Sequence, residues 1–467
     1  MNRKYSQAIA DLVAAYEATT QSGSNKFLDP QAYHELINYY EEDEQLDRAL
    51  EVADLAIAHH QFSAEFYTRK AHLLLEVQQE LQALETLGIA TIYAPNSLEI
   101  KILESEALTY LDRTQEAMEL LENSKFDLSR SSAEMSEILL AESLIYQHKE
   151  EYELMYFILE SALKENPKNR EALDRVWLAV ELSKQYENSV KLHEWVIDQD
   201  PYSALAWYNL GHTNAYLGNY EAAIEAYEYA FIIDNKFEYA YRDFSDLCFE
   251  MKKYKRALDG YLEMIEHFEA ESESLLRIGQ CYKELGNLDE AWAFFLKALQ
   301  LDTLNDEVYF HLGTCYSAQG CYKEALKAFQ KAINIEDLQE DYYVALGETY
   351  YYLDKFNAAK ASFKKAITLA PEQTHCWIKY CRFLLKIDHG EEALALMEEA
   401  IDQSYDTSLV YGQIACLFYL GREQEAKYRL GDALVDDFVS HDTLFTIYPP
   451  LAEEEAVHSQ VKVYLGM

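Results

Sequence analysis

The chain has 467 residues, of which 82 are Asp or Glu and 40 are Lys or Arg, so its formal net charge is −42 at pH 7. Such a charge repels phosphate backbones and anionic lipid headgroups, which argues against nucleic acid and membrane surfaces as partners. No stretch approaches the roughly 18 or more consecutive apolar residues of a membrane-spanning helix.

Residues 1–29 predict an N-terminal capping helix. The segment MNRKYSQAIADLVAAYEATTQ begins with basic residues, but its apolar positions then alternate with Gln, Asp and Glu at helical spacing. A secretory signal has an uninterrupted apolar stretch instead. We therefore expect a cytoplasmic protein, provided that no N-terminal signal was removed from this chain.

Residues 30–440 predict twelve consecutive repeats with a period of 34 residues. Three repeats at 30–131 and two at 136–203 diverge from the common pattern, whereas those at 204–440 follow it closely. Four residues separate the first two groups, and the repeat at 374–406 is one residue short. A period of this length is typical of proteins in which each repeat packs on its neighbours. We therefore expect one elongated array rather than several globular domains.

The regular repeats carry small residues at fixed places. Gly211, Gly279, Gly313 and Gly347 recur at intervals of 34 or 68 residues, and each follows a Leu or Ile. An Ala stands twelve residues after each Gly, and an aromatic residue follows four positions later. Gly inside a helix costs about 1 kcal/mol relative to Ala, so these glycines need a structural reason. We expect that they allow two helices to approach closely.

The spacing within one repeat predicts a pair of helices. Tyr309 and Leu312 are three residues apart, and Ala325 and Phe329 are four apart, so each pair shares one helix face. Gly320 lies between the two helices, where a helix commonly ends. Each repeat therefore reads as helix, turn, helix.

This pattern resembles the tetratricopeptide repeat. In the repeat at 204–237 the matching residues are Trp207, Gly211, Ala223, Tyr227 and Ala230. The resemblance implies an all-α fold, a right-handed superhelical α-solenoid of about twelve helix-turn-helix repeats with capping helices at 1–29 and 441–467. It also implies that the first helix of each pair lines a concave groove that binds extended peptides or a helix of a partner.

The resemblance further predicts which residues face this groove. Counted from the Gly position, they lie three before it, one after it, and four or five after it. The candidate peptide-binding residues at these places are Tyr208, His212, Tyr216, Arg242, Asp246, Phe249, Gln280, Phe310, Glu348, Tyr351 and Tyr352.

Two interpretations of the aromatic residues in this set fit the sequence. Aromatic side chains are enriched at binding hot spots, which favours a role in partner recognition. Alternatively, they pack against the next repeat and extend the core. Family members that bind chaperone tails hold a C-terminal carboxylate with Lys, Asn and Arg, and this clamp is not reproduced at the equivalent places. Acidic and aromatic residues instead favour a basic, partly apolar partner segment.

No signature of catalysis or of metal binding is found in the sequence. His34-Glu35 and His193-Glu194 lack the second His of a zinc protease helix, and no glycine-rich loop follows a strand. The seven cysteines contain no C-x-x-C pair, so we interpret them as small packing residues. We expect no enzyme activity, no metal and no cofactor.

Two functions follow from the sequence. The preferred one is a non-catalytic protein–protein interaction scaffold whose acidic and aromatic groove binds a basic, partly apolar peptide segment or helix. The alternative is a structural module that associates with itself through one end of the solenoid, as a homodimer. The segment at 441–467, with Leu451, Val457, Val461 and Tyr464, would then cap the last repeat or dock on a second copy.

Overall fold

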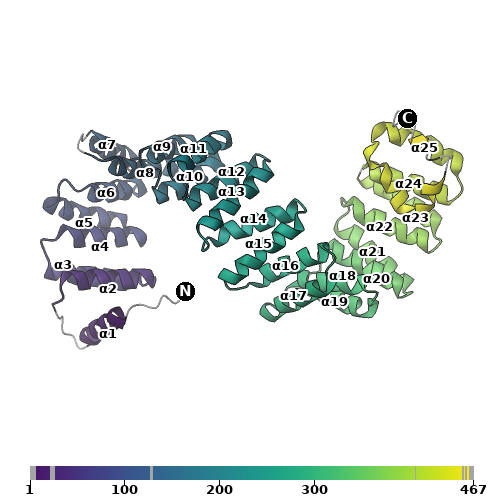
Figure 1. The fold of residues 1–467 in the computed structure, drawn as a ribbon, viewed down its shortest axis with the longest axis horizontal. Coiled ribbons are helices and arrows are strands. Elements are labelled where there is room, and N and C mark those ends of the chain that lie inside the picture. Colours follow the sequence, from purple (N-terminus) through teal and green to yellow (C-terminus); the bar gives the residue numbers. More distant parts are fainter. Residues whose placement is uncertain are drawn as a thin grey trace. The chain divides into compact units, whose positions relative to one another are not determined.

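The computed structural model describes residues 7–21, 27–126, 130–404, 406–454, 457 and 460–461. The chain divides into an N-terminal part, Met1–Phe244, and a C-terminal part, Ser245–Met467. Helices make up both parts, and the described residues contain no strand (Figure 1). The predicted all-α helical repeat is therefore confirmed.

The helices of the N-terminal part follow one another in antiparallel pairs after a single first helix. They are α1 Gln7–Gln21, α2 Pro30–Glu42, α3 Leu46–His59, α4 Ala64–Glu76, α5 Glu80–Tyr93, α6 Leu98–Tyr110, α7 Thr114–Lys125, α8 Ser132–His148, α9 Tyr152–Glu165, α10 Arg170–Ser183, α11 Tyr186–Gln199, α12 Ala204–Tyr216 and α13 Tyr220–Ile233. The boundary between the two parts falls within α14, Glu238–Glu250.

The C-terminal part continues the same alternation of paired helices. It contains α15 Tyr254–His267, α16 Ser272–Glu284, α17 Leu288–Leu301, α18 Asp306–Ala318, α19 Tyr322–Ile335, α20 Glu340–Tyr352, α21 Phe356–Leu369, α22 Thr374–Lys386, α23 Gly390–Gln403, α24 Thr407–Tyr419, α25 Glu423–Asp436, the 3-10 helix η1 Val439–His441, α26 Asp442–Ile447 and the 3-10 helix η2 Pro449–Glu453.

Side chains at the start of several first helices explain where those helices begin. The Ser203 hydroxyl accepts a hydrogen bond from the backbone N–H of Ala206, and the Asn305 side chain accepts one from Val308. Such caps satisfy backbone donors that have no partner within the helix. The Trp207 indole adds a tie to the preceding turn, because its Nε1 donates to the carbonyl oxygen of Pro201 at 3.0 Å.

Each helix pair turns through a residue with a left-handed backbone. Gly218, Gly286, Gly320 and Gly421 have φ between 74° and 84°. Non-glycine residues adopt this conformation in the other turns, namely Glu44, Gln78, Asp112, Glu150, Lys184, Lys252, Asp354 and Asp388. Gly at the end of the first helix, as the sequence pattern predicts, is therefore found in some turns, and other residues adopt the same backbone conformation in the rest.

Helix α8 begins earlier than the sequence pattern predicts. The four residues that separate the repeats at 98–131 and 136–169 form the first turn of α8, which starts at Ser132. A reciprocal cap fixes this start, because Glu134 accepts from the backbone N–H of Ser131 at 2.9 Å, while the Ser131 hydroxyl accepts from Glu134 N–H. The insertion therefore lengthens a helix instead of forming a loop.

The segment after α25 packs on the last repeats of the C-terminal part. Leu451, Val457 and Val461 are buried in one cluster with residues of α22, α24 and α25. Gly412 in α24 leaves room for Ile447, whose Cδ1 would lie 3.3 Å from an added Cβ. Tyr464, which the sequence places in the same capping segment, lies outside the described residues, as do residues 1–6 and 22–26 of the predicted N-terminal cap.

Among the described residues, no helix combines the length and the apolar character that crossing a bilayer requires.

Candidate functional site

In the N-terminal part, Tyr208 and His212 form one aromatic cluster. Their rings meet edge to face with centroids 4.4 Å apart, and His212 stacks on Trp177 at 4.8 Å. The Tyr208 hydroxyl donates to Asp243 Oδ2 at 2.7 Å. Burial, reinforced by this carboxylate, raises the pKa of Tyr208, and burial lowers the pKa of His212. Both residues are therefore engaged in contacts between neighbouring repeats.

Tyr216 and Arg242 differ from Tyr208 in that each donates a hydrogen bond to a glutamate. The Tyr216 side chain is 55% exposed, although its ring stacks on Tyr186 at 5.1 Å and its hydroxyl donates to Glu181 at 3.2 Å. Arg242 donates to Glu238, one turn earlier in the same helix, at 2.9 Å. Tyr216 is thus an aromatic surface held in a fixed orientation, which is the property expected of a binding residue.

In the C-terminal part, four of the candidate residues contact their own or the next repeat. Asp246 accepts a hydrogen bond from the Tyr261 hydroxyl, and Phe249 packs edge to face on Tyr254. Gln280 is only 6% exposed, and its amide nitrogen lies 2.8 Å from His311 Nε2. Phe310 stacks on Tyr342 with centroids 4.9 Å apart, and also contacts His311 and Phe329.

The last three candidates lie on α20. Glu348 accepts from Lys379 of α22 at 2.8 Å, and the Lys386 ammonium lies 5.2 Å from the Tyr351 ring. Tyr352 is 52% exposed and stacks on Tyr322 with centroids 4.5 Å apart. Of the predicted set, Tyr216 and Tyr352 thus present the most aromatic surface.

An acidic cavity lies in the N-terminal part, between α4, α6, α8 and α10. Its volume is about 730 Å³. Its carboxylates are Glu76, Glu99, Glu106, Glu134, Glu137 and Glu171. Its apolar lining consists of Leu98, Ile102, Leu103, Leu140, Ala141 and Leu144, and His72 and Arg175 complete it. The arrangement offers negative charge beside an apolar floor.

Partial burial affects the pKa of two of these carboxyl groups, Glu106, which is half-buried, and Glu137, which is more exposed. Burial raises the pKa of Glu106, against the lowering effects of Arg175 and His72. Burial also raises the pKa of Glu137, and the nearby Glu171 adds to this rise. Among the described residues of the lining, Arg175 supplies the single guanidinium, and it donates to Glu171 at 2.7 Å. Six carboxylates and one guanidinium line the cavity, so a cation entering it would meet a net negative charge.

The sequence interpretation missed this cavity, although the signal was present. The groove-facing places are counted from the Gly of the regular repeats, and the repeats that form the cavity lack this Gly. In the repeat at 64–97 the Gly position is Ala71, and the places one and five after it hold His72 and Glu76. In the next repeat, the place one after Ser105 holds Glu106. These three residues line the cavity.

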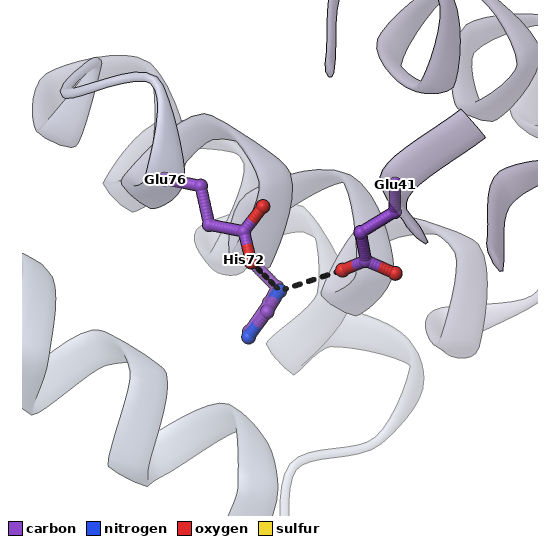
Figure 2. A group of neighbouring side chains, drawn as sticks. All are labelled: Glu41, His72 and Glu76. Atoms are coloured by element: carbon purple, nitrogen blue, oxygen red, sulfur yellow. Dashed lines mark ion pairs between the residues drawn. The ribbon is translucent and has the colours of Figure 1, made fainter. Parts of the chain in front are cut away.

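Within the part of the chain that the structure describes, two side-chain clusters contain ligand types that bind metal ions. Glu41, His72 and Glu76 each offer one ligand atom, as do Glu340, Asp341 and His375, and within each cluster these atoms lie within 4.8 Å of one another. Figure 2 shows the His72 ring between the carboxylates of Glu41 and Glu76. His72 Nδ1 is 3.7 Å from Glu41 Oε1 and 3.6 Å from Glu76 Oε1.

Comparison with solved structures finds similar helical-repeat proteins. YrrB, described as a TPR protein with an unusual peptide-binding site, is 21% identical, covers 39% of this chain and 95% of its own, and has a TM-score of 0.34. Cut9–Hcn1 of the APC/C is 12% identical over 99% of both chains, with a TM-score of 0.39. The C-terminal part of a TPR repeat-containing protein from Cytophaga hutchinsonii is 17% identical over 54% of this chain and 99% of its own, with a TM-score of 0.39. At these identities and scores the likeness does not extend to function.

Comparison with curated proteins finds no match. Family models, in contrast, match three segments of the chain. Residues 204–237, 271–337 and 340–373 each match a model described as Tetratricopeptide repeat. These segments cover the repeats in which the Gly, Ala and aromatic pattern is most regular, and each contains the helix pairs that the pattern predicts. Residues 204–237, 271–337 and 340–373 of this chain are therefore tetratricopeptide repeats.

Proposed function

We propose that the chain binds a basic, partly apolar peptide segment or helix of a partner protein in the acidic cavity between α4, α6, α8 and α10. Tetratricopeptide repeats support a role as a protein–protein interaction scaffold, and such scaffolds are typically non-catalytic. The proposal that the partner segment is basic and partly apolar rests on the lining of the cavity, which places six glutamates around an apolar floor.

The two kinds of lining have separate roles in this proposal. Carboxylates attract Lys or Arg side chains and accelerate the encounter, since opposite charges steer association. The apolar residues of α6 and α8 would cover the aliphatic or aromatic side chains of the same segment, and their burial supplies most of the affinity. A volume of about 730 Å³ holds a few side chains, so a short segment suffices.

The aromatic residues predicted from the sequence extend the proposal. Tyr216 in the N-terminal part and Tyr352 in the C-terminal part are the most exposed of them, and each is held by a stacked neighbour. We propose that these two offer contact area to a partner, whereas Tyr208 and Phe310 mainly pack between repeats.

A fluorescently labelled amphipathic helical peptide, with Leu at every third or fourth position and Lys elsewhere, provides the probe. Fluorescence anisotropy with the full chain is compared for this peptide and for its Glu-Leu counterpart. We expect binding of the Lys-Leu peptide only, with an affinity that falls as salt is added. Equal binding of both peptides would contradict the proposed charge selectivity.

A matched pair of variants locates the binding. Glu106→Gln with Glu137→Gln removes two cavity charges, whereas Glu194→Gln with Glu225→Gln removes two exposed charges on the second helices α11 and α13. Both variants change the net charge equally. The first should weaken binding by roughly tenfold or more, and the second should leave it nearly unchanged. If the variant of α11 and α13 weakened binding more than the cavity variant, the binding site would lie outside the cavity.

A further inference from the structure

We infer that Glu41, His72 and Glu76 form a binding site for a divalent transition-metal ion such as Zn²⁺. His72 and Glu76 lie four residues apart on one face of α4, and Glu41 comes from the end of α2. One imidazole nitrogen and one oxygen from each carboxylate converge within 4.8 Å (Figure 2).

The spacing of these atoms matches a shared ion better than direct hydrogen bonds. His72 Nδ1 lies 3.6 Å and 3.7 Å from its two carboxylate oxygens, which is longer than an ordinary N–H···O distance of about 2.7–3.2 Å. Zinc bonds to nitrogen and oxygen measure roughly 2.0–2.2 Å, so two ligands in a tetrahedral site are separated by about 3.3–3.5 Å. Small side-chain rotations would bring all three atoms to that separation.

The His72 nitrogen that faces the carboxylates has an unmet bonding capacity. Nδ1 is buried, although 42% of the side chain is exposed, and it has no hydrogen-bond partner among the described residues. A buried polar atom without a partner costs free energy, and coordination of an ion would satisfy it.

Arg69 holds Glu41 in place for this role. Its Nη2 donates to Asn38 Oδ1 at 2.7 Å and also contacts Glu41 Oε2. Glu41 Oε1 is therefore the oxygen left facing His72. Outer hydrogen bonds of this kind orient metal ligands. With two carboxylates and one guanidinium, the site carries a net charge of about −1 before an ion binds, which favours a divalent cation.

The ligand set selects the class of ion. Imidazole nitrogen with carboxylate oxygen suits Zn²⁺, Mn²⁺, Fe²⁺ or Co²⁺, whereas Mg²⁺ and Ca²⁺ prefer oxygen alone. Three protein ligands also leave a fourth position for water or for a donor group from a partner. The site is therefore able to join this chain to a second molecule.

The cluster of Glu340, Asp341 and His375 serves as an internal comparison. There, His375 Nε2 already lies 2.9 Å from Asp341 Oδ1, a normal hydrogen-bond distance. Its nitrogen is thus satisfied without an ion, and we expect no comparable affinity for a metal at that place.

Isothermal titration of the EDTA-treated full chain with ZnCl₂, in buffer that contains excess Mg²⁺, tests the inference. We expect one Zn²⁺ per chain for the wild type, affinity reduced by about 10- to 100-fold or more in His72→Gln, and wild-type affinity in His375→Gln. Visible absorption of added Co²⁺ reports the same site independently, because tetrahedral Co²⁺ absorbs strongly and His72→Gln should lose that band.

Three outcomes would overturn the inference, namely no Zn²⁺ binding by the wild type, wild-type binding by His72→Gln, or loss of binding in His375→Gln. Circular dichroism of each variant without metal checks that the helices are intact. Glu76→Gln provides a second variant with a smaller change in packing, and it should also weaken Zn²⁺ binding.

Discussion

The phenyl ring of Phe329 lies directly against the Cα of Gly313, so that a Cβ added at Gly313 would be 2.5 Å from ring atom Cε1. The same relationship joins Gly211 to Tyr227, where the distance would also be 2.5 Å. In both pairs the glycine belongs to the first helix of a repeat and the aromatic ring to the second. The absence of a side chain on one helix is therefore what admits the ring of the other.

Replacing Gly313 by Ala should destabilise the C-terminal part by about 1–3 kcal/mol, because Phe329 is almost fully buried and has little room to move. The urea midpoint of unfolding measures this effect. Gly88→Ala is the matched control, since Gly88 lies within α5 and has no atom within 4 Å of an added Cβ. There the better helix propensity of Ala should stabilise by up to about 1 kcal/mol. Equal midpoints for the two variants would contradict the close approach at Gly313.

The turns offer a second test that separates backbone strain from packing. Gly320 has φ of 74° and no atom within 4 Å of an added Cβ, so Gly320→Ala changes only the backbone preference. It should destabilise by about 1 kcal/mol. Lys184 adopts φ of 58° in the equivalent turn after α10. Lys184→Gly should therefore be neutral or stabilising by up to about 1 kcal/mol, as measured by urea unfolding. If Lys184→Gly lowered the free energy of unfolding, the contacts of the Lys184 side chain would contribute more to stability than relief of its backbone strain.

These relationships show why the regular repeats could be predicted from the sequence. Gly313 and Phe329 are sixteen residues apart, and the same spacing joins Gly211 to Tyr227, so a local pattern reports a contact between two helices. The start of α8 was missed because the Ser131–Glu134 cap extends the helix without changing the repeat pattern that follows it.

The candidate site was less predictable because its contacts join residues from different repeats. Gln280 is buried by His311 of the next repeat, and Tyr208 is held by Asp243, which is 35 residues away. A pattern that marks the inward face of a helix does not state which neighbouring side chain will cover that face. For the same reason the acidic cavity, in repeats without the marker Gly, was not identified from the sequence.

The cysteines predict a simple labelling result. Cys321 is exposed, whereas the other six are buried, including Cys381 and Cys416, whose sulfur atoms are 3.4 Å apart. Reaction with Ellman's reagent needs an accessible thiolate. The native chain under reducing-agent-free conditions should release colour from one rapidly reacting thiol, and Cys321→Ser should abolish that phase. Denaturant should then expose the remaining thiols. Rapid reaction of several thiols in the native state would contradict the packing interpretation of these residues.

Acid should weaken the N-terminal part through His193. This side chain is fully buried on α11, and its Nδ1 lies 2.8 Å from the carbonyl oxygen of Ser189. Burial lowers the pKa of His193 from 6.5 to about 4. The unfolded chain therefore binds a proton more readily than the folded chain in this range. The contribution of the neutral His193 side chain to the free energy of unfolding is therefore fully present above about pH 6.5. It is lost as the pH falls towards about 4.

The pKa difference of His193 corresponds to a loss of about 3 kcal/mol across this range. Urea midpoints measured at several pH values should fall less steeply between pH 6.5 and 4 for His193→Leu than for the wild type, because leucine takes up no proton on unfolding. The comparison uses the slope, which is insensitive to a constant change in packing. Identical slopes for the two proteins would mean that His193 is already protonated, or accessible to protons, in the folded chain.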